Sequence, residues 1–236
     1  AGNGPFPCVI ILTGVGTSKE ETHFSAQPLV ERNIAVLTLD IPGTGESLFC
    51  RNLKFRFADI KAAVTSAITH LEHTEIINNK IGVYGICMGG ILAYKIASTE
   101  ERVTFCATAF PLRIEKIDKT RAPLWMKSGK WYHFFSGGIE DTLFSHELTI
   151  QDYEVVQCTY ILIHGRHDNW TLIEDALCLY KRAKGKKDKI IIEDEAAITG
   201  DSSITHTMPV GEQYHWIKHV VADWIKNQVY QENLSS

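Results

Sequence analysis

The sequence predicts an α/β fold with a doubly wound, mostly parallel sheet and a small helical cap inserted after the strand that ends near Ala109. Short, uninterrupted apolar runs, typical of strands buried on both faces of a parallel sheet, alternate with segments of helical periodicity. The alternation stops after Phe110 and resumes near Cys158. We therefore expect a core formed by 1–110 and 158–236 and a cap at 111–157.

Each expected element has a simple local signature. The strands are apolar runs bounded by Gly, Pro or polar residues. We expect them at 8–13, 34–39, 81–84, 103–109, 160–164 and 189–193. The helices repeat apolar residues every three or four positions. We expect them at 19–32, 57–71, 88–98 and 171–183. A closing helix follows, with Trp216, Val220, Trp224 and Ile225 on one face.

The insertion at 111–157 is rich in aromatic residues and is interrupted by Gly129 and the Gly137-Gly138 pair. Its rings belong to Trp125, Trp131, Tyr132, Phe134, Phe135 and Phe144. As a group they predict an apolar or aromatic pocket under a small helical cap, although any single ring is more often a packing residue.

Length and composition indicate one ordinary globular domain. The chain has 236 residues, 44% of them hydrophobic and 22% charged, and a net charge of −4. It shows no basic stripe for nucleic acid, and no apolar run approaches the roughly 18–20 residues of a membrane-spanning helix. We expect a cytoplasmic protein whose partner is a small molecule, with neither nucleic acid nor membrane; a homodimer stays open.

The six cysteines indicate free thiols. They form no Cys-x-x-Cys pair, and most lie in or beside expected strands and helices, which fits a reducing compartment better than a disulfide framework. The chain also begins without Met and enters a strand by Cys8. We therefore expect a further segment before Ala1.

A nucleophile elbow is the central motif. Gly85-Ile86-Cys87-Met88-Gly89 lies between an expected strand and an expected helix. The elbow holds its nucleophile in strained geometry and requires small residues two positions before and after it, as Gly85 and Gly89 are. The helix after Cys87 directs its first N–H groups at the sulfur, which favours a thiolate and offers a donor to an oxyanion. The motif predicts nucleophilic acyl transfer.

Two further residues complete a candidate triad. Asp168 follows the strand at 160–164, and His206 lies in the loop after the last strand. Ligands of parallel sheets bind at the carboxyl ends of the strands, where both residues and Cys87 are expected. Taken singly, Asp168 could cap a helix and His206 could be an exposed loop residue. Together they follow the order nucleophile, acid, histidine.

These motifs resemble the α/β-hydrolase superfamily over nearly the whole chain. The resemblance rests on Gly85-x-Cys87-x-Gly89-Gly90, Asp40-x-Pro42-Gly43-x-Gly45-x-Ser47 and His164-Gly165-x-x-Asp168. Cysteine at the elbow is similar to dienelactone hydrolases, whose triad is Cys, Asp and His. The Pro-Gly turn and the cap are more similar to capped esterases of the fermentation-respiration switch type and to 2,6-dihydropseudooxynicotine hydrolase, a C–C bond hydrolase. Those relatives usually carry Ser at the elbow, and their N-terminal extension fits the segment expected before Ala1.

The resemblance implies a mechanism. Cys87 is the expected nucleophile, His206 its general base and Asp168 the group that orients the imidazole. The N–H groups of Val15 and Met88 are the expected oxyanion hole. The residues expected at the substrate are Gly14, Trp125, Trp131 and Tyr132. The implied activity is that of a hydrolase or an acyl transferase, with water or another nucleophile as the acyl acceptor, and no cofactor is implied. The implied substrate is an ester, lactone or thioester with a bulky apolar or aromatic acyl part, a polyketide-like metabolite among the candidates.

Three other functions stay open. A C–C bond hydrolase of the same fold would proceed through similar tetrahedral chemistry. A nicotinamide-binding Rossmann domain would use Gly14-x-Gly16 and Asp40, but Lys19 stands where the third glycine belongs. A non-catalytic binding protein would keep the hydrolase fold without its activity.

Two other polar features have plainer interpretations. Asp40 reads as a structural carboxylate in a turn or at a helix cap. His215 and His219 stand four apart on a helix, a spacing that metal ligands use, but no third ligand is apparent, so we expect no metal.

Overall fold

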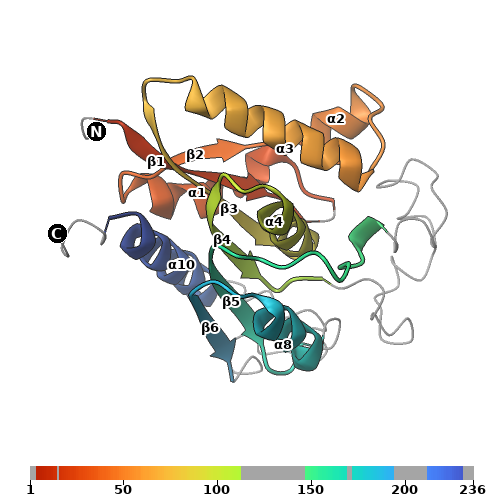
Figure 1. Cartoon of the computed structure of the whole chain (residues 1–236), viewed down its shortest axis with the longest axis vertical. Helices are drawn as coiled ribbons and strands as arrows, with labels where there is room; N and C mark the ends of the chain where they lie inside the picture. The colour runs from red at the N-terminus through yellow and green to blue at the C-terminus, as the bar shows by residue number, and fades with distance from the viewer. Residues whose placement is uncertain (1–3, 15, 113–146, 169–171, 194–211, 231–236) are drawn as a thin grey trace.

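A sheet of six parallel strands forms the centre of the chain (Figure 1). The computed structural model describes residues 4–14, 16–112, 147–168, 172–193 and 212–230, with the backbone alone for 212–215. The strands are β1 Phe6–Leu12, β2 Ala35–Thr38, β3 Ile77–Ile86, β4 Val103–Ala109, β5 Thr159–Gly165 and β6 Lys187–Ile192. Their order across the sheet is β2-β1-β3-β4-β5-β6, so the strand that carries the elbow lies near the middle.

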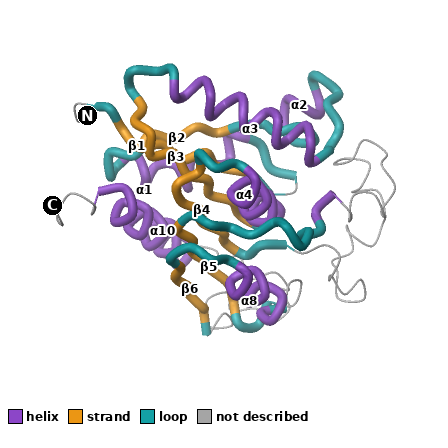
Figure 2. The backbone as a smooth tube through the Cα atoms, in the orientation of Figure 1, coloured by secondary structure: helices purple, strands orange, loops and turns teal. Residues whose placement is uncertain are grey.

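Helices cover both faces of this sheet (Figure 2). They are η1 Lys19–Thr22, α1 His23–Val30, α2 Gly45–Phe49, α3 Phe57–Glu72, α4 Met88–Thr99, α8 Ile173–Arg182 and α10 Glu212–Tyr230. Side chains of α3, α4 and α8 join one core cluster, and those of α1 and α10 join another. The doubly wound arrangement predicted from the alternation of strands and helices is confirmed.

Strand β1 shows why a continuous apolar run forms here. Cys8, Ile10 and Leu12 enter the cluster beneath α3 and α4, whereas Val9 and Ile11 enter the cluster beneath α1 and α10. Successive side chains of a strand point to opposite faces, and both faces are covered by helices. Every position from Cys8 to Leu12 is therefore buried and apolar.

The register brings the carboxyl ends of the strands to one edge of the sheet. Leu12 of β1 pairs with Gly85 of β3, Ile86 of β3 pairs with Ala109 of β4, and Ala109 pairs in turn with Ile163 of β5. The loops after β1, β3 and β5 therefore leave the sheet at a similar height. This edge is where an open α/β sheet binds its ligands.

Most elements lie where the sequence predicts them, and the differences have physical causes. The strand expected at 103–109 has those bounds. The helix expected at 19–32 is instead a 3-10 turn followed by α1, and the Pro-Gly turn contains the short helix α2. The second strand was expected to be buried, but β2 is half-buried because it is an edge strand with one neighbour.

The face predicted for the closing helix is only partly right, since Ile225 is buried and Trp224 packs against the cluster beneath α1 and α10 but Trp216 does not. The buried side chains of α10 include a row spaced by four residues, at Ile217, Val221, Ile225 and Val229. Trp216 is 54% exposed, and of the four predicted residues only Ile225 is buried. The prediction counted Trp216 as part of the buried face, but the buried row begins one residue later, at Ile217. The sheet instead selects the stripe that carries aliphatic residues on every turn.

The chain's insertion is described only at its ends. Residues 147–157, assigned by sequence to the end of the cap, place Leu148, Ile150 and Val156 in the cluster beneath α3 and α4. The remainder of the expected cap, 113–146, lies outside the described residues. In the part of the chain that is described, none of the helices combines the length and the hydropathy needed to cross a membrane.

Candidate active site

The elbow at Cys87 has the strained backbone that the motif predicts. Cys87 lies between β3 and α4 with φ 58° and ψ −121°, in a region that residues other than glycine seldom enter. A Cβ on Gly85 would lie 1.9 Å from the carbonyl oxygen of Gly89, and a Cβ on Gly89 would lie 2.0 Å from that of Leu12. Only glycine fits at either position, so the requirement for small residues is confirmed.

Backbone hydrogen bonds hold the elbow in this conformation. The Cys87 N–H donates to the Ala109 carbonyl over 2.9 Å. The Cys87 carbonyl accepts from the N–H groups of Gly90 and Leu112, at 2.9 and 3.0 Å. The strain at Cys87 is therefore imposed by its neighbours on β4 and α4 and by the first residues after β4.

The loop after β1 passes directly beside the thiol. A Cβ placed on Gly14 would lie 3.3 Å from Cys87 Cβ and 3.8 Å from Cys87 Sγ. The Thr17 hydroxyl donates to the Gly14 carbonyl over 3.0 Å and so closes the turn. Met88 is buried at the first position of α4, where a backbone N–H has no partner within the helix. Both segments that were expected to provide oxyanion donors therefore border Cys87.

Asp168 lies two strands away from the elbow at the same edge. It follows β5, which is separated from β3 by β4 alone, and the residue is 2% exposed. His164 at the end of β5 is fully buried, with its ring centroid 6.2 Å from that of Phe110 after β4. A buried carboxyl group at this strand end matches the position expected for the triad acid.

Several of the expected site residues lie outside the described residues. They are Val15, Trp125, Trp131, Tyr132 and His206. The structure therefore brings together Cys87, Met88 and Gly14 and places Asp168 at the same edge of the sheet.

The six cysteines are all free, as predicted, but their environments differ. Burial raises the pKa of Cys8 and of Cys158 to about 12, and burial also raises the pKa of Cys106. Cys87 is half-buried, whereas Cys50 and Cys178 are exposed. Burial thus disfavours the thiolate at three of the thiols, and the two exposed thiols are natural references for the reactivity of Cys87.

Asp40 is structural, as predicted. It accepts hydrogen bonds from the Lys19 N–H at 2.8 Å, from Lys19 Nζ at 2.8 Å and from the Glu46 N–H at 3.1 Å. Burial opposes ionisation, but these hydrogen bonds outweigh it and hold the pKa of Asp40 below its usual value. The carboxylate ties the start of η1 to α2. The same contacts leave it poorly placed to bind a ribose.

Of the two histidines with metal-like spacing, only His219 has a described side chain. His219 Nδ1 lies 3.3 Å from Arg32 Nη1, and the side chain of His215 is not described. Across the described residues, no group of three or more His, Cys, Asp or Glu side chains comes together in a way that could hold a metal ion.

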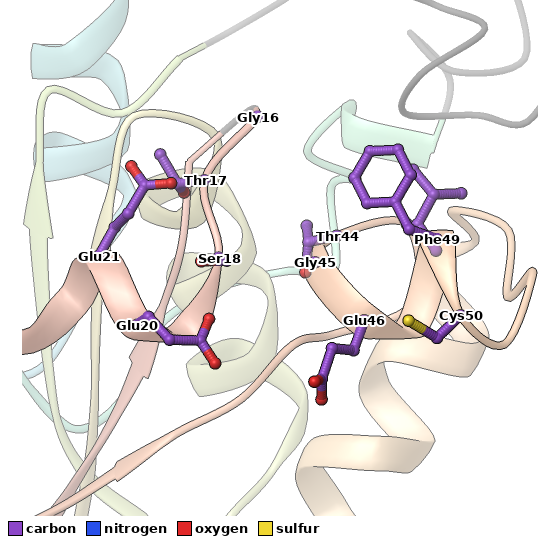
Figure 3. Close-up of a pocket in the computed structure, with 12 residues that line it drawn as sticks. Gly16, Thr17, Ser18, Glu20, Glu21, Thr44, Gly45, Glu46, Phe49 and Cys50 are labelled. Atoms are coloured by element: carbon purple, nitrogen blue, oxygen red, sulfur yellow. The ribbon is translucent and has the colours of Figure 1, made fainter.

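A cavity of about 500 Å³ opens at the carboxyl ends of β1 and β2 (Figure 3). One wall is η1 with the loop before it, and the other is α2. Its lining residues are Gly16, Thr17, Ser18, Glu20, Glu21, Gly43, Thr44, Gly45, Glu46, Leu48, Phe49 and Cys50. Sequence reasoning missed this site. The available signal was that two turns rich in Gly follow neighbouring strands, at 14–18 and at 42–47.

Comparison with families of known proteins decides the class of this site. The model of the dienelactone hydrolase family matches residues 44–192, which is more than half of the chain. The chain belongs to the dienelactone hydrolase family. The matched residues include both Cys87 and Asp168. Membership of this family and the contacts of Asp40 together speak against the nicotinamide-binding alternative.

Individual relatives agree with the family. 2,6-Dihydropseudooxynicotine hydrolase of Paenarthrobacter nicotinovorans is 31% identical over 169 residues, which are 71% of this chain and 46% of that protein. 20-Hydroxy-prefusarin hydrolase of Gibberella moniliformis is 27% identical over 149 residues, which are 60% of this chain and 34% of that protein. The chain thus spans less than half the length of these two relatives.

A solved structure shows the same fold. The crystal structure of 2,6-dihydroxy-pseudo-oxynicotine hydrolase matches 98% of this chain and 63% of its own, with a TM-score of 0.78 and 22% sequence identity. The α/β-hydrolase fold predicted from the elbow and the strand-end residues is therefore confirmed.

Proposed function

We propose that this member of the dienelactone hydrolase family hydrolyses an ester, lactone or thioester through a covalent intermediate on Cys87. The observation that carries the proposal is the backbone of Cys87, which is held at φ 58° between a strand and a helix. Strained backbone conformations of this kind are found mainly at functional sites. Here the strain presents a side chain that an ordinary turn would bury. Gly14, beside the sulfur, leaves space for a reacting carbonyl group.

The proposed reaction has two halves. The Cys87 sulfur attacks the carbonyl carbon, and the N–H groups of Met88 and Val15 donate to the oxyanion. His206 takes the thiol proton and delivers it to the leaving group as the carbon–leaving-group bond breaks, while Asp168 orients the imidazole. Water then attacks the thioester with His206 as base, which releases the acid and restores the thiol.

The nature of the nucleophile narrows the proposed substrates. Sulfur attacks a carbonyl readily but is also a good leaving group, so the tetrahedral intermediate collapses forward only if the substrate's own leaving group is comparable. Activated esters, enol lactones and thioesters meet this condition, and simple alkyl esters do not. The aromatic residues expected in the cap favour a bulky apolar or aromatic acyl part.

A second candidate is hydrolysis of an activated C–C bond. The relative that is 31% identical, 2,6-dihydropseudooxynicotine hydrolase, favours it. The bond would break with release of a stabilised carbanion, which satisfies the same condition on the leaving group.

Trapping the acyl-enzyme tests the proposal. The His206→Ala variant keeps the thiol but deacylates slowly, so an aromatic acyl thioester should add the mass of its acyl group to the peptide that contains Cys87. The exposed Cys50 and Cys178 are internal references, and Cys87→Ala/His206→Ala is the control. Acylation spread evenly over Cys50, Cys87 and Cys178 would contradict a special nucleophile. Absence of any adduct together with absence of turnover would favour a non-catalytic binding protein.

A further inference from the structure

The cavity between η1 and α2 is a neighbour of the candidate active site. Gly16 and Thr17 line it, and Thr17 is hydrogen-bonded to Gly14, the residue beside Cys87 Sγ. The cavity lies at the ends of β1 and β2, and β1 pairs directly with β3. Neighbouring strands are about 4.8 Å apart, so the cavity begins on the order of 5–10 Å from the thiol. This distance is short enough for one arm of a small substrate to extend from the Cys87 thiol into the cavity.

The walls of the cavity are negatively charged. Glu20 and Glu21 lie on the wall of η1, and Glu46 lies on the wall of α2 (Figure 3). Among the described residues that line the cavity, none is Lys, Arg or His. A cavity with three carboxylates and no lining cation attracts a positively charged group.

Lys19, which does not line the cavity, offsets only part of the charge of these carboxylates. Its single ammonium group lies 2.9 Å from Glu20, 2.8 Å from Asp40 and 2.8 Å from Glu46. Hydrogen bonding to Lys19 lowers the pKa of Glu20 to about 2, so that carboxylate is ionised at neutral pH. One positive charge therefore faces three negative ones. Glu21 is a further carboxylate, and no ion pair joins it to another of the described residues.

An exposed aromatic ring completes the cavity. Phe49 is 71% exposed on the wall of α2, next to Leu48. A large ring left in water in the same cavity as the carboxylates can contact an organic cation through its π face. The same carboxylates are not grouped in a way that could hold a metal ion, so an inorganic cation fits this lining less well.

We propose that this cavity binds a cationic organic group, a protonated amine or a quaternary ammonium, on one arm of the substrate that is cleaved at Cys87. The inference rests on the proposed function in one respect, which is that the substrate's reacting carbonyl lies at Cys87. The carboxylates select the charge, Phe49 and Leu48 contact the apolar groups around the nitrogen, and the short distance to Gly14 sets the length of the arm.

Binding to an inactive chain tests the subsite separately from catalysis. The probes are the 4-phenylbutanoyl thioester of thiocholine and its neutral isostere, in which a quaternary carbon replaces the nitrogen. Calorimetry on Cys87→Ala should show that the cationic probe binds about tenfold more tightly. The ratio of the affinities for the cationic and the neutral probe should fall roughly threefold in Cys87→Ala/Glu21→Gln. It should fall by a similar factor for Cys87→Ala in about 0.5 M salt. The matched control Cys87→Ala/Glu75→Gln removes an exposed charge elsewhere and should keep the full margin.

Two results would overturn the subsite. The first is equal affinity for the cationic and the neutral probe. The second is a preference for the cation that survives Glu21→Gln, Glu46→Gln and Phe49→Leu, because the cation would then bind elsewhere. Hydrolysis of the neutral thioester by the wild-type chain tests the proposed function independently. The two proposals can therefore fail separately.

Discussion

At the scale of single residues, Cys87 combines a reactive group with an unfavourable backbone. Its φ of 58° and ψ of −121° suit glycine, and an L residue with a side chain pays for them with strain of about 1–3 kcal/mol. The neighbours that enforce this conformation, Gly85 and Gly89, are in such close contact with other backbone atoms that no larger residue fits. This strain lowers stability at the elbow, where the proposed nucleophile lies.

This strain predicts a gain of stability on removing the side chain. Cys87→Gly should unfold with a free energy about 1 kcal/mol larger than that of Cys87→Ala, because the relief of strain exceeds the greater backbone entropy of glycine in the unfolded chain. Both variants lack the thiol, so the comparison isolates the backbone. Urea unfolding followed by circular dichroism measures it. A Cys87→Gly protein no more stable than Cys87→Ala would show that the turn is relaxed.

At the scale of elements, α4 is fixed by a buried ion pair. Lys95 Nζ lies 2.8 Å from Glu154 Oε1 and donates to the Thr149 carbonyl over 2.8 Å, and both charged side chains are almost fully buried. The ammonium also lies 4.4 Å from the ring centroid of Phe57, at the start of α3. The helix that follows the nucleophile is thus tied to α3 and to the segment that returns from the insertion.

Removing one partner of this ion pair should lower the free energy of unfolding more than replacing both partners by apolar residues. Lys95→Met leaves the Glu154 carboxylate buried without its cation and should lower the free energy of unfolding by about 3–5 kcal/mol. The double variant Lys95→Met/Glu154→Leu should recover most of that loss, because no buried charge remains. Denaturant unfolding of the two single variants and the double variant checks this. If the loss of unfolding free energy in the double variant equalled the sum of the losses in the two single variants, the two side chains would act independently.

At the scale of the whole molecule, ion pairs between elements make stability depend on pH. Glu100 accepts hydrogen bonds from Arg102 at 2.8 and 2.9 Å and from Thr65 at 3.0 Å. Arg102 also donates to Glu72 on α3 over 2.7 Å. Pairing with Arg102 lowers the pKa of Glu100 from 4.5 to about 2 despite partial burial.

The direction of that pKa shift predicts loss of stability in acid. The unfolded chain takes up a proton at Glu100 near pH 4.5, and the folded chain does so only near pH 2, so the contribution of Glu100 is present above pH 4.5 and is lost as pH falls towards 2. Glu100→Gln should lower Tm at pH 7 by roughly 2–4 °C, for about 1 kcal/mol after solvent screening, and should show a shallower fall in acid. Calorimetry across this range measures both effects, with Glu75→Gln as the control. A parallel fall in wild type and Glu100→Gln would assign the acid sensitivity to other groups.

The sequence by itself determined the order of strands and helices along the chain and the position of the elbow at Cys87. These properties are local. An apolar run of five or six residues is already a strand buried on both faces, and Gly85 and Gly89 mark the elbow by their spacing from Cys87. Asp168 and His206 could be named as candidates because parallel strands deliver their following loops to one edge. The structure places Asp168 at that edge, whereas His206 lies outside the described residues, so the triad stays a prediction.

Only the tertiary structure decided what depends on contacts between distant residues. The buried face of α10 is selected by the sheet beneath it, so Ile217 is buried and Trp216 is exposed. Lys19 pairs with Asp40 and Glu46 across two loops and so ties η1 to α2, the two walls of the cavity beside the candidate active site. Periodicity describes how one segment presents its side chains. It does not describe which segment they meet, because that depends on how the whole chain packs.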